Sequence, residues 1–371
     1  MSWRSEPPFR ADHVGSLLRP ERLLEARDRH AAGELDDDGL RAVEDDAIRE
    51  AVRMQESVGL QSATDGEFRR ASWHMDFIFQ LGGAARVMDD SLKVEFRNDA
   101  GTIVFAPPSL HIDAPVRLEH TIFADAFRFL RDAVSTAVPK LTIPSPSMVH
   151  WRGHIDRDVY PELGAFFTDL AATYREEVRR LGELGCTYLQ LDDTSLAYLN
   201  DPMQRAHVAE IGGDPDHMHE VYIARMNEAL AGRPAGMRVT THMCRGNFRS
   251  SWAAEGSYEF VAERLLNDLA VDGFFMEFDD ERSGGFEPLR FLPKGKLVVL
   301  GLVTTKRGAL EQKDELKRRI EEASRFADIE QLCLSPQCGF SSTVEGNVLT
   351  RDEQRAKLEL IVETAREVWD T

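Results

Sequence analysis

Apolar and polar positions along the chain follow two patterns, one with helical spacing and one of short continuous runs. The helical pattern is clearest in Asp37–Ser57, where apolar residues recur every three or four positions. Carboxylates at positions 36–38 can cap the start of this stretch, and Gly59 can end it. The same spacing recurs at 166–181, before Gly185, and at 316–326. We therefore expect a helix at each of these three places.

Between the helical stretches lie short runs that are apolar or β-branched and that end on polar residues. They occupy positions 11–16, 61–65, 141–145, 187–192, 237–241, 273–277, 297–303 and 331–335. Such strands, each followed by a helical stretch or by an insertion and then a helix, predict an α/β fold of the closed parallel type, the (β/α)8 or TIM barrel. An open doubly wound sheet is the alternative, but no glycine-rich phosphate motif follows the first predicted strand.

One insertion interrupts the alternation after the second predicted strand. It covers residues 70–115 and contains Asn98-Asp99-Ala100-Gly101 between two alternating runs. A turn sequence in this setting predicts a β-hairpin over 91–106. We expect residues 1–371 to form one barrel domain that contains this insertion. Two domains of ordinary size are the alternative on length alone.

Composition narrows the class of protein rather than the fold. The 371 residues carry 45 basic and 64 acidic side chains, a formal net charge of −19, without a long block of like charge. An acidic, mixed surface disfavours nucleic acid or an anionic membrane as partner. The longest apolar run, 297–303, is too short to span a bilayer, and the N-terminal residues contain no apolar signal segment, so we expect a cytoplasmic protein. Four cysteines in a chain of this length favour metal binding or catalysis over a disulfide scaffold. Homo-oligomer formation stays open.

The residues at the ends of the predicted strands carry most of the chemistry. In a β/α barrel the C-terminal strand ends converge on one mouth. Polar strand ends are expected in any barrel, because strands stop where they reach water, but this set includes two thiols, an imidazole and several carboxylates. The set is Ser16, Asp65, Glu67, Ser145, Asp192, Asp193, His242, Cys244, Glu277, Lys306 and Cys338.

Four of these residues form a candidate metal site. His242 and Cys244 stand two positions apart, so their side chains share one face of an extended segment. The pair alone is weak evidence, because a buried histidine beside a buried thiol is common in protein cores. Glu277 and Cys338 follow after 33 (277 − 244) and 61 (338 − 277) residues, which excludes a zinc finger and suits a metal held between barrel strands. One nitrogen, two sulfurs and one oxygen suit tetrahedral zinc, and a carboxylate that a substrate thiol can displace favours S-alkylation.

Over nearly its whole length the chain resembles the C-terminal catalytic barrel of cobalamin-independent methionine synthase, above all the short stand-alone bacterial forms. The resemblance rests on Arg10-Ala-Asp-His-Val-Gly-Ser16, Thr64-Asp-Gly-Glu67, Leu189-Gln-Leu-Asp192-Asp193, Thr241-His-Met-Cys244, Phe274-Phe-Met-Glu-Phe278 and Cys338-Gly339. It implies zinc as cofactor, with the ligands His242, Cys244, Glu277 and Cys338. It also implies that Ser16, Glu67 and Asp192 contact homocysteine. Glu67 and Asp192 suit the ammonium of an amino acid, and the Ser16 hydroxyl suits its carboxylate.

The resemblance thus implies a zinc-dependent methyltransferase that converts homocysteine into methionine. Two alternatives remain open. One is transfer of a different electrophile, such as an opened epoxide, to another thiol; the other is a non-catalytic, zinc-stabilised binding barrel. The acidic pair Glu67 and Asp192 favours an amino-acid thiol over a sulfonated thiol, which would need basic residues. Displaceable coordination by Glu277 favours catalysis over a structural metal.

The methyl donor stays open between a folate, a corrinoid and a sulfonium compound, because the chain departs from the family in two respects. The long synthases carry a second, N-terminal barrel that helps to hold the folate tail, and we do not expect one here. In addition, Lys306 stands where the family has a histidine that assists the leaving group. Lys306 and Asp192 are the candidate catalytic residues. Because lysine is a weaker acid than histidine, we expect simple methylfolate to be a poor donor and a corrinoid or sulfonium compound a better one.

A few other residues near the predicted mouth have two interpretations each. Trp73, His74 and Trp151 follow the second and third predicted strands, where they either stack on a flat donor or pack in the core. Arg282 follows Glu277 in a charged loop, where it either orients Glu277 or is solvated.

Overall fold

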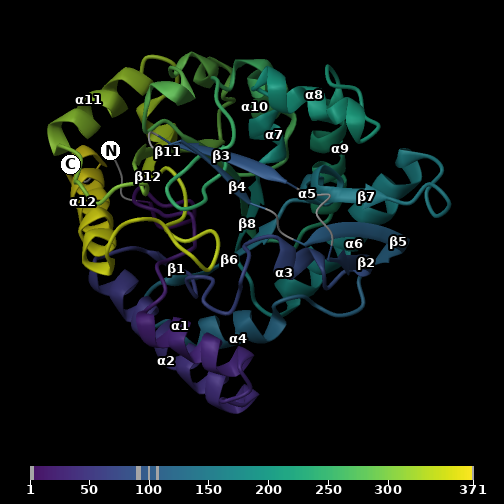
Figure 1. Ribbon diagram of the computed structural model, residues 1–371. Helices are drawn as coiled ribbons and strands as arrows, with labels where there is room; N and C mark the ends of the chain where they lie inside the picture. The colour runs from purple at the N-terminus through teal and green to yellow at the C-terminus, as the bar shows by residue number, and fades with distance from the viewer. Residues whose placement is uncertain (1–3, 89–92, 99–100, 106–107, 370–371) are drawn as a thin grey trace.

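The computed structural model describes residues 4–88, 93–98, 101–105 and 108–369, and its centre is a curled parallel sheet (Figure 1). Seven strands pair in the order β1-β6-β8-β9-β10-β11-β12, each parallel to its neighbours. They are β1 (Ser62–Ala63), β6 (Val138–Pro144), β8 (Tyr188–Asp193), β9 (Arg238–Met243), β10 (Gly273–Glu277), β11 (Leu297–Val303) and β12 (Leu332–Pro336). The predicted parallel α/β architecture is confirmed.

The expected first strand, 11–16, is wrong as a strand. It makes a single parallel bridge, between Ala11 and Leu334. The segment nevertheless lies between the two edges of the sheet: Leu334 N donates to Arg10 O at 2.8 Å on one side, and Thr64 Oγ1 donates to Gly15 O at 2.6 Å on the other. Side-chain hydrogen bonds replace part of the strand ladder, and Gly15 takes a φ of 151°, which departs from strand geometry.

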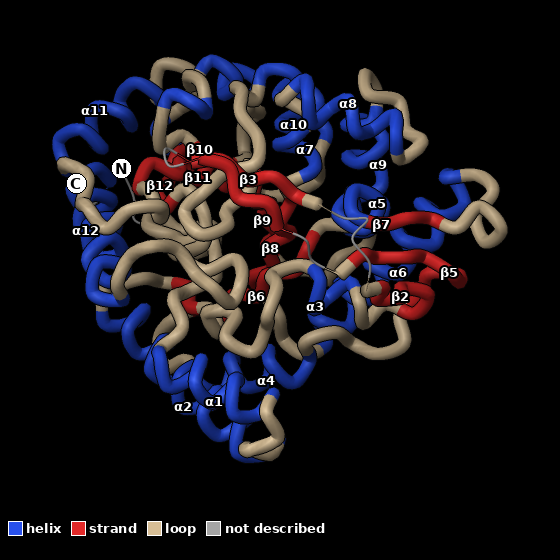
Figure 2. Tube along the Cα trace, in the orientation of Figure 1, coloured by secondary structure: helices blue, strands red, loops and turns tan. Residues whose placement is uncertain are grey.

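Helices cover the outside of the sheet, as Figure 2 shows. Asp37–Ser57 is helical as predicted, with Asp36 accepting from Gly39 N at 2.8 Å and Gly59 at a φ of 93° beyond its end. The predicted helix at 166–181 lies inside a longer one, and the one at 316–326 ends earlier, at Ala323. No helix of the described ranges is at once long and apolar enough to cross a membrane.

The helices have the following bounds. They are α1 (Glu21–Ala31), α2 (Asp37–Ser57), α3 (Met75–Ile78), α4 (Ala124–Ala133), α5 (Ser147–Arg152), α6 (Leu163–Glu183), α7 (Ser195–Tyr198), α8 (Pro202–Glu210), α9 (Met218–Leu230), α10 (Glu259–Asp268), α11 (Lys313–Ala323) and α12 (Arg351–Trp369), with 3-10 turns η1 (Glu281–Ser283), η2 (Glu287–Phe291) and η3 (Ile329–Gln331).

The insertion between β1 and β6 contains the expected hairpin. Strands β3 (Val94–Asn98) and β4 (Gly101–Phe105) pair antiparallel, while the predicted turn positions 99–100 and the flanking positions 91–92 and 106 lie outside the described residues. Backbone hydrogen bonds of 2.7 and 2.9 Å join Arg97 to Trp252, and so attach the hairpin to the loop after β9. The insertion also supplies β2 (Gly82–Val87) and β5 (Ser109–Arg117), which form a second sheet with β7 (Gly153–Ile155).

Candidate active site

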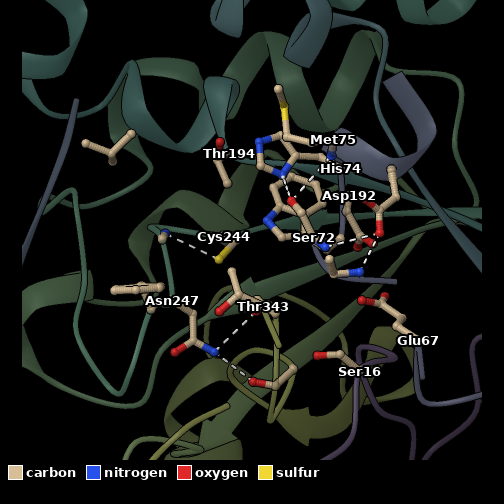
Figure 3. A pocket seen from close by; sticks show the side chains of 18 of the residues that line it. Ser16, Glu67, Ser72, His74, Met75, Asp192, Thr194, Cys244, Asn247 and Thr343 are labelled. Atoms are coloured by element: carbon tan, nitrogen blue, oxygen red, sulfur yellow. Dashed lines mark hydrogen bonds between the residues drawn. The ribbon is translucent and has the colours of Figure 1, made fainter. Parts of the chain in front are cut away.

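The C-terminal ends of the strands surround a cavity of about 270 Å³ (Figure 3). The loop after β1, the end of β8, the end of β9 and the loop after β12 all contribute to its wall. Of the residues predicted from the sequence, the cavity is lined by Ser16, Glu67, Trp73, His74, Asp192, His242, Cys244 and Cys338. Residues up to 322 positions apart (338 − 16) therefore meet in one place, because parallel strands of a barrel end at one mouth.

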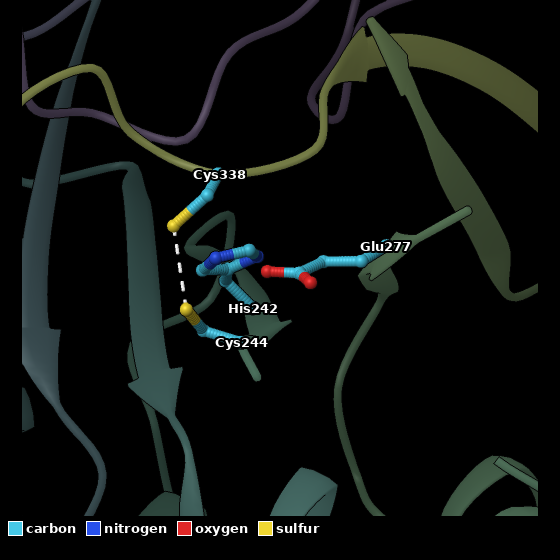
Figure 4. A group of neighbouring side chains, drawn as sticks. All are labelled: His242, Cys244, Glu277 and Cys338. Atoms are coloured by element: carbon cyan, nitrogen blue, oxygen red, sulfur yellow. Dashed lines mark hydrogen bonds between the residues drawn. The ribbon is translucent and has the colours of Figure 1, made fainter. Parts of the chain in front are cut away.

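The four predicted metal ligands form a compact buried group at this mouth (Figure 4). The ligand atoms of His242, Cys244, Glu277 and Cys338 all lie within 4.8 Å of one another, and the two sulfurs are 3.3 Å apart. His242 is the next-to-last residue of β9, Glu277 is the last residue of β10, and Cys338 lies two residues after the end of β12 at Pro336. Their role as ligands stays a prediction, but the fold places them as that role requires.

Unpartnered polar atoms mark this group as a fit for a metal ion. Within the described residues, neither ring nitrogen of His242 has a hydrogen-bond partner, and neither does Glu277 Oε2, although all three atoms are buried. Buried polar atoms without partners are rare and costly in proteins. A nitrogen, two sulfurs and a carboxylate oxygen make a donor set that suits zinc.

The charges of the group support the same interpretation. A hydrogen bond from Cys244, and then the neighbouring His242, lower the pKa of Cys338 well below that of an ordinary thiol. The same thiol contact raises the pKa of Cys244, and burial raises the pKa of Glu277. The surroundings thus favour the ionised form of Cys338 and disfavour the ionised forms of Cys244 and Glu277, which a divalent cation bound beside them would favour.

Tyr258 and Arg245 hold the backbone around the group in place. The Tyr258 hydroxyl donates to Met243 O at 3.0 Å and accepts from Glu277 N at 2.9 Å, so it ties the ends of β9 and β10 together. Arg245 Nη1 donates to the same hydroxyl at 2.9 Å, and its backbone N–H donates to Glu277 Oε1 at 3.3 Å. The Glu277 carboxylate is thereby oriented on one oxygen only.

Glu67 reaches the cavity from an unusual backbone conformation. Its φ is 62°, a left-handed value that costs a non-glycine residue roughly 1–2 kcal/mol. The surrounding structure holds it there: Asp65 Oδ1 accepts from Glu67 N at 2.9 Å, and Arg19 Nη2 donates to Glu67 O at 2.9 Å. Thr142 Oγ1 donates to Glu67 Oε1 at 2.7 Å, with Arg70 Nη1 3.6 Å from the same oxygen. Strain of this kind is concentrated at functional sites.

Asp192 and Ser16 complete the end of the cavity where Glu67 lies. Asp192 pairs in register with His242 on the next strand, and Gln190 Nε2 donates to its Oδ1 at 2.7 Å. Burial raises the pKa of Asp192 to about 7. Ser16 Oγ accepts from Ser341 N at 3.2 Å and packs against Gly339, where any Cβ would stand 2.0 Å from that oxygen.

Comparison with known proteins assigns the chain to a family. Residues 9–367 match the family model described as cobalamin-independent synthase, catalytic domain. The chain belongs to this cobalamin-independent synthase family, a family of methyltransferases. Among curated proteins, it is 44% identical to the uncharacterized protein YxjH of Bacillus subtilis, over 98% of this chain and 95% of that one. A methionine synthase of Pyrococcus abyssi is 25% identical, over 88% of this chain and 85% of its own length.

Solved structures of similar proteins agree on the fold. One, from Listeria monocytogenes, is provisionally assigned as a vitamin-B12-independent methionine synthase; it is 35% identical and superposes with a TM-score of 0.78 over 99% of both chains. Another is a B12-independent methionine synthase from Shewanella sp. W3-18-1 in complex with selenomethionine, with 19% identity and a TM-score of 0.71 over 97% of both chains. These neighbours are TIM barrels of the methionine synthase type.

Three residues that the sequence placed near the mouth lie apart from the cavity wall. Lys306 Nζ is 3.5 Å from Asp279 Oδ2, and Lys306 is not among the cavity residues. Arg282 contacts the same Asp279, at 3.6 Å, rather than Glu277. Trp151 is buried against Tyr198 with ring centroids 5.8 Å apart, which is core packing.

An aromatic wall in the cavity was not predicted from the sequence. The hairpin supplies Phe96 and Phe105, whose ring centroids lie 5.2 and 4.6 Å from that of Phe248. A hairpin sequence does not reveal where its apolar face docks, so the long-range contact with Phe248 had no local signal. Trp73 and His74, flagged as loop rings, do line the cavity, with ring centroids 4.3 Å apart.

Proposed function

We propose that this protein is a zinc-dependent methyltransferase that transfers a methyl group to the sulfur of homocysteine and forms methionine. The observation that carries the proposal is the layout of one cavity. It offers a buried group with the donor atoms that zinc prefers, and beside it two buried carboxylates and a serine hydroxyl suited to an amino acid. Membership of a methyltransferase family and the selenomethionine complex of the Shewanella relative support the choice of substrate.

In this proposal His242, Cys244, Glu277 and Cys338 hold the zinc ion. Zinc bound there lowers the pKa of a substrate thiol, so that the thiol reacts as a thiolate at neutral pH. Two thiolate ligands keep the site electron-rich, which preserves the nucleophilicity of that sulfur. Glu277 would be the ligand that a substrate sulfur displaces most easily, because Arg245 N already donates to one of its oxygens.

The remaining residues place the amino acid. The ammonium of homocysteine would lie between the carboxylates of Glu67 and Asp192, both of which are buried and have raised pKa values because of that burial. An ammonium supplies the positive charge that favours their ionised forms. Ser16 would donate its hydroxyl hydrogen to the substrate carboxylate. Holding both ends of the amino acid fixes the distance from its α-carbon to the sulfur.

The test has two parts. Metal analysis of the purified protein should find about one zinc per chain, and homocysteine should be converted to methionine with at least one donor from a panel of methylfolates, methylcobalamin and S-methylmethionine. A thiol with the same chain length but no amino group is the control, and it should bind more weakly. Zinc-loaded protein that methylates no thiol with any of these donors would overturn the proposal.

A further inference from the structure

If the methyl donor of the proposed function is an amine, the reaction requires a proton for the leaving nitrogen. When a methyl group leaves a tertiary amine, the electron pair of the C–N bond stays on nitrogen, which must be protonated to leave readily. Lys306 is poorly placed to supply that proton, so methylfolate can be an effective donor only if another acid lines the cavity. The Lys306 ammonium is paired with Asp279 at 3.5 Å, and the residue does not line the cavity.

Several other acidic groups of the cavity are engaged or too weak, and Asp76 is one of them, because it accepts from Ser72 N at 3.3 Å. Glu67 and Asp192 already accept hydrogen bonds from Thr142 and Gln190, and the substrate ammonium occupies their free side. Burial raises the pKa of Tyr198 far above neutrality, so its hydroxyl is a poor acid. Among the described residues that line the cavity, this leaves one imidazole outside the metal group, that of His74.

The imidazole of His74 is fixed on one side by neighbouring residues and lines the cavity. His74 stands immediately before α3, and its Nδ1 lies 3.1 Å from Ser72 Oγ, which also accepts from Met75 N at 3.4 Å. Trp73 packs on its ring. Among the described residues, no side chain or backbone group forms a hydrogen bond with its Nε2, and His74 lines the cavity. One ring nitrogen is therefore fixed by serine, and the other is left for a ligand.

The position of His74 in the cavity suits a contact with the methyl donor. In the view of Figure 3, Ser16 and Glu67 lie at one end, His74 at the other, and Cys244 and Asp192 between them. An amino acid held at the Ser16 end with its sulfur near Cys244 would present that sulfur toward the end where His74 lies. The methyl donor must approach the sulfur from the side away from the rest of the amino acid.

We propose that His74 is a catalytic residue whose Nε2 delivers a proton to the leaving nitrogen of an amine-type methyl donor. The sulfur lone pair forms the new S–C bond, the C–N bond breaks with its electron pair on nitrogen, and that nitrogen takes the proton from Nε2. The proton lost by the homocysteine thiol restores the imidazolium. In sum, a thiol and an N-methyl amine give a thioether and an N–H amine.

The environment of His74 suits this cycle. Burial, together with the nearby Arg152, lowers its pKa well below the ordinary value. The ring is then neutral when substrates enter and can accept the thiol proton. Once protonated it is a stronger acid than an ordinary imidazolium, and it passes the proton on readily.

Comparing two donors tests the proposal. The variant is His74→Asn, assayed with homocysteine and either methylfolate, which leaves as an amine, or S-methylmethionine, which leaves as a neutral thioether and needs no proton. We expect kcat with methylfolate to fall by about 100-fold or more, and kcat with S-methylmethionine by less than about 5-fold. His154→Asn makes the same chemical change at an exposed position outside the cavity and serves as the matched control.

A second variant keeps the test decisive when only one donor works. Imidazole added to His74→Ala should restore methylfolate turnover, and should do nothing for His154→Ala. Equal losses with both donors, absence of rescue, or loss of zinc or of homocysteine affinity in His74→Asn would each overturn the role of His74. Wild-type protein that uses a sulfonium but not methylfolate would also overturn it, while leaving the proposed function intact. Failure with every donor would instead defeat the proposed function.

Discussion

Replacing Asp192 by asparagine should make the protein more stable and the site weaker, and the two effects can be measured separately. Burial raises the pKa of Asp192 from 3.8 to about 7. The folded protein therefore holds a proton that the unfolded chain has already released between these pH values. Stability contributed by the protonated group is complete below pH 3.8 and is lost as pH rises through 7.

The size of the effect follows from the same two values. A difference of about 3 (7 − 3.8), at about 1.36 kcal/mol per pKa unit, sets a ceiling of about 4 kcal/mol above pH 7. A positive charge on His242 lowers the pKa of Asp192 and so offsets part of the effect of burial, and a zinc ion bound nearby would lower it too. Asparagine keeps an oxygen for Gln190 Nε2, now 2.7 Å from Oδ1, so little is lost there. We therefore expect Asp192→Asn to gain about 1–2 kcal/mol at pH 8 and almost nothing near pH 4.

Urea unfolding of the zinc-loaded protein at pH 4.5 and pH 8 measures this change, and calorimetric titration with homocysteine measures the site. Loss of a charged partner for the ammonium should weaken homocysteine about 10- to 100-fold, equivalent to about 1.5–3 kcal/mol. Asp193→Asn is the matched control. Its carboxylate accepts from Ser145 Oγ, Ser147 Oγ and Leu196 N, so that variant should lose stability. An Asp192→Asn protein that is less stable than wild type at pH 8, or whose difference ignores pH, would refute the reasoning.

Variants at four other positions test the remaining parts of the site. Cys244→Ser and Cys338→Ser should each lose both zinc and methyl-transfer activity. Cys333→Ser changes a buried thiol outside the metal group and should keep its zinc. Metal analysis measures the zinc content, and full zinc content in either ligand variant would contradict the assignment. Glu67→Gln removes the negative charge but keeps an oxygen that accepts from Thr142. It should therefore raise the Kd of homocysteine by about 10- to 100-fold and leave the zinc content unchanged. An unchanged Kd in titration calorimetry would count against the ammonium site. Lys306→Met should lower the free energy of unfolding in urea by about 1–2 kcal/mol, since it leaves the buried Asp279 carboxylate with Arg282 as its one cationic partner among the described residues. No loss of stability would show that the ion pair contributes nothing.

The regular elements could be predicted because their signals are local. The helix Asp37–Ser57 has its apolar spacing, its capping aspartate and its terminal glycine within one short window. The prediction of a strand at 11–16 was wrong because an apolar run does not indicate which segment it pairs with. The carbonyls of 11–16 and the Asp12 carboxylate are satisfied by side chains of Thr64, Ser62 and Tyr188, contacts that exist only after the barrel closes.

Residues of the candidate site could be predicted when their side chains are of types that bind metals or take part in catalysis. Two cysteines, a histidine and a glutamate at strand ends are unusual enough to be noticed, and the parallel fold then brings them together. Lys306 was placed by alignment to a family position, but the sequence does not show that Asp279 holds its ammonium. The roles of Thr142, Tyr258 and Gln190 had no signal, because common residues acquire a function only from the groups beside them.

One electrostatic feature joins the two halves of the site. Glu67, Asp192 and Glu277 all have raised pKa values, each chiefly because of burial. The protein supplies incomplete compensation: Arg70 stands 3.6 Å from Glu67, and Arg245 3.9 Å from Glu277 Oε2, both beyond hydrogen-bond distance. Burying acids without full partners is costly, and removing the charge would be the simple remedy if stability were the only requirement. In the proposed function two cations would satisfy the acids instead, a metal beside Glu277 and an ammonium between Glu67 and Asp192. On this argument the site suits a metal and an amino acid bound together, and the protein would be less stable without them than if these acids were replaced by neutral residues.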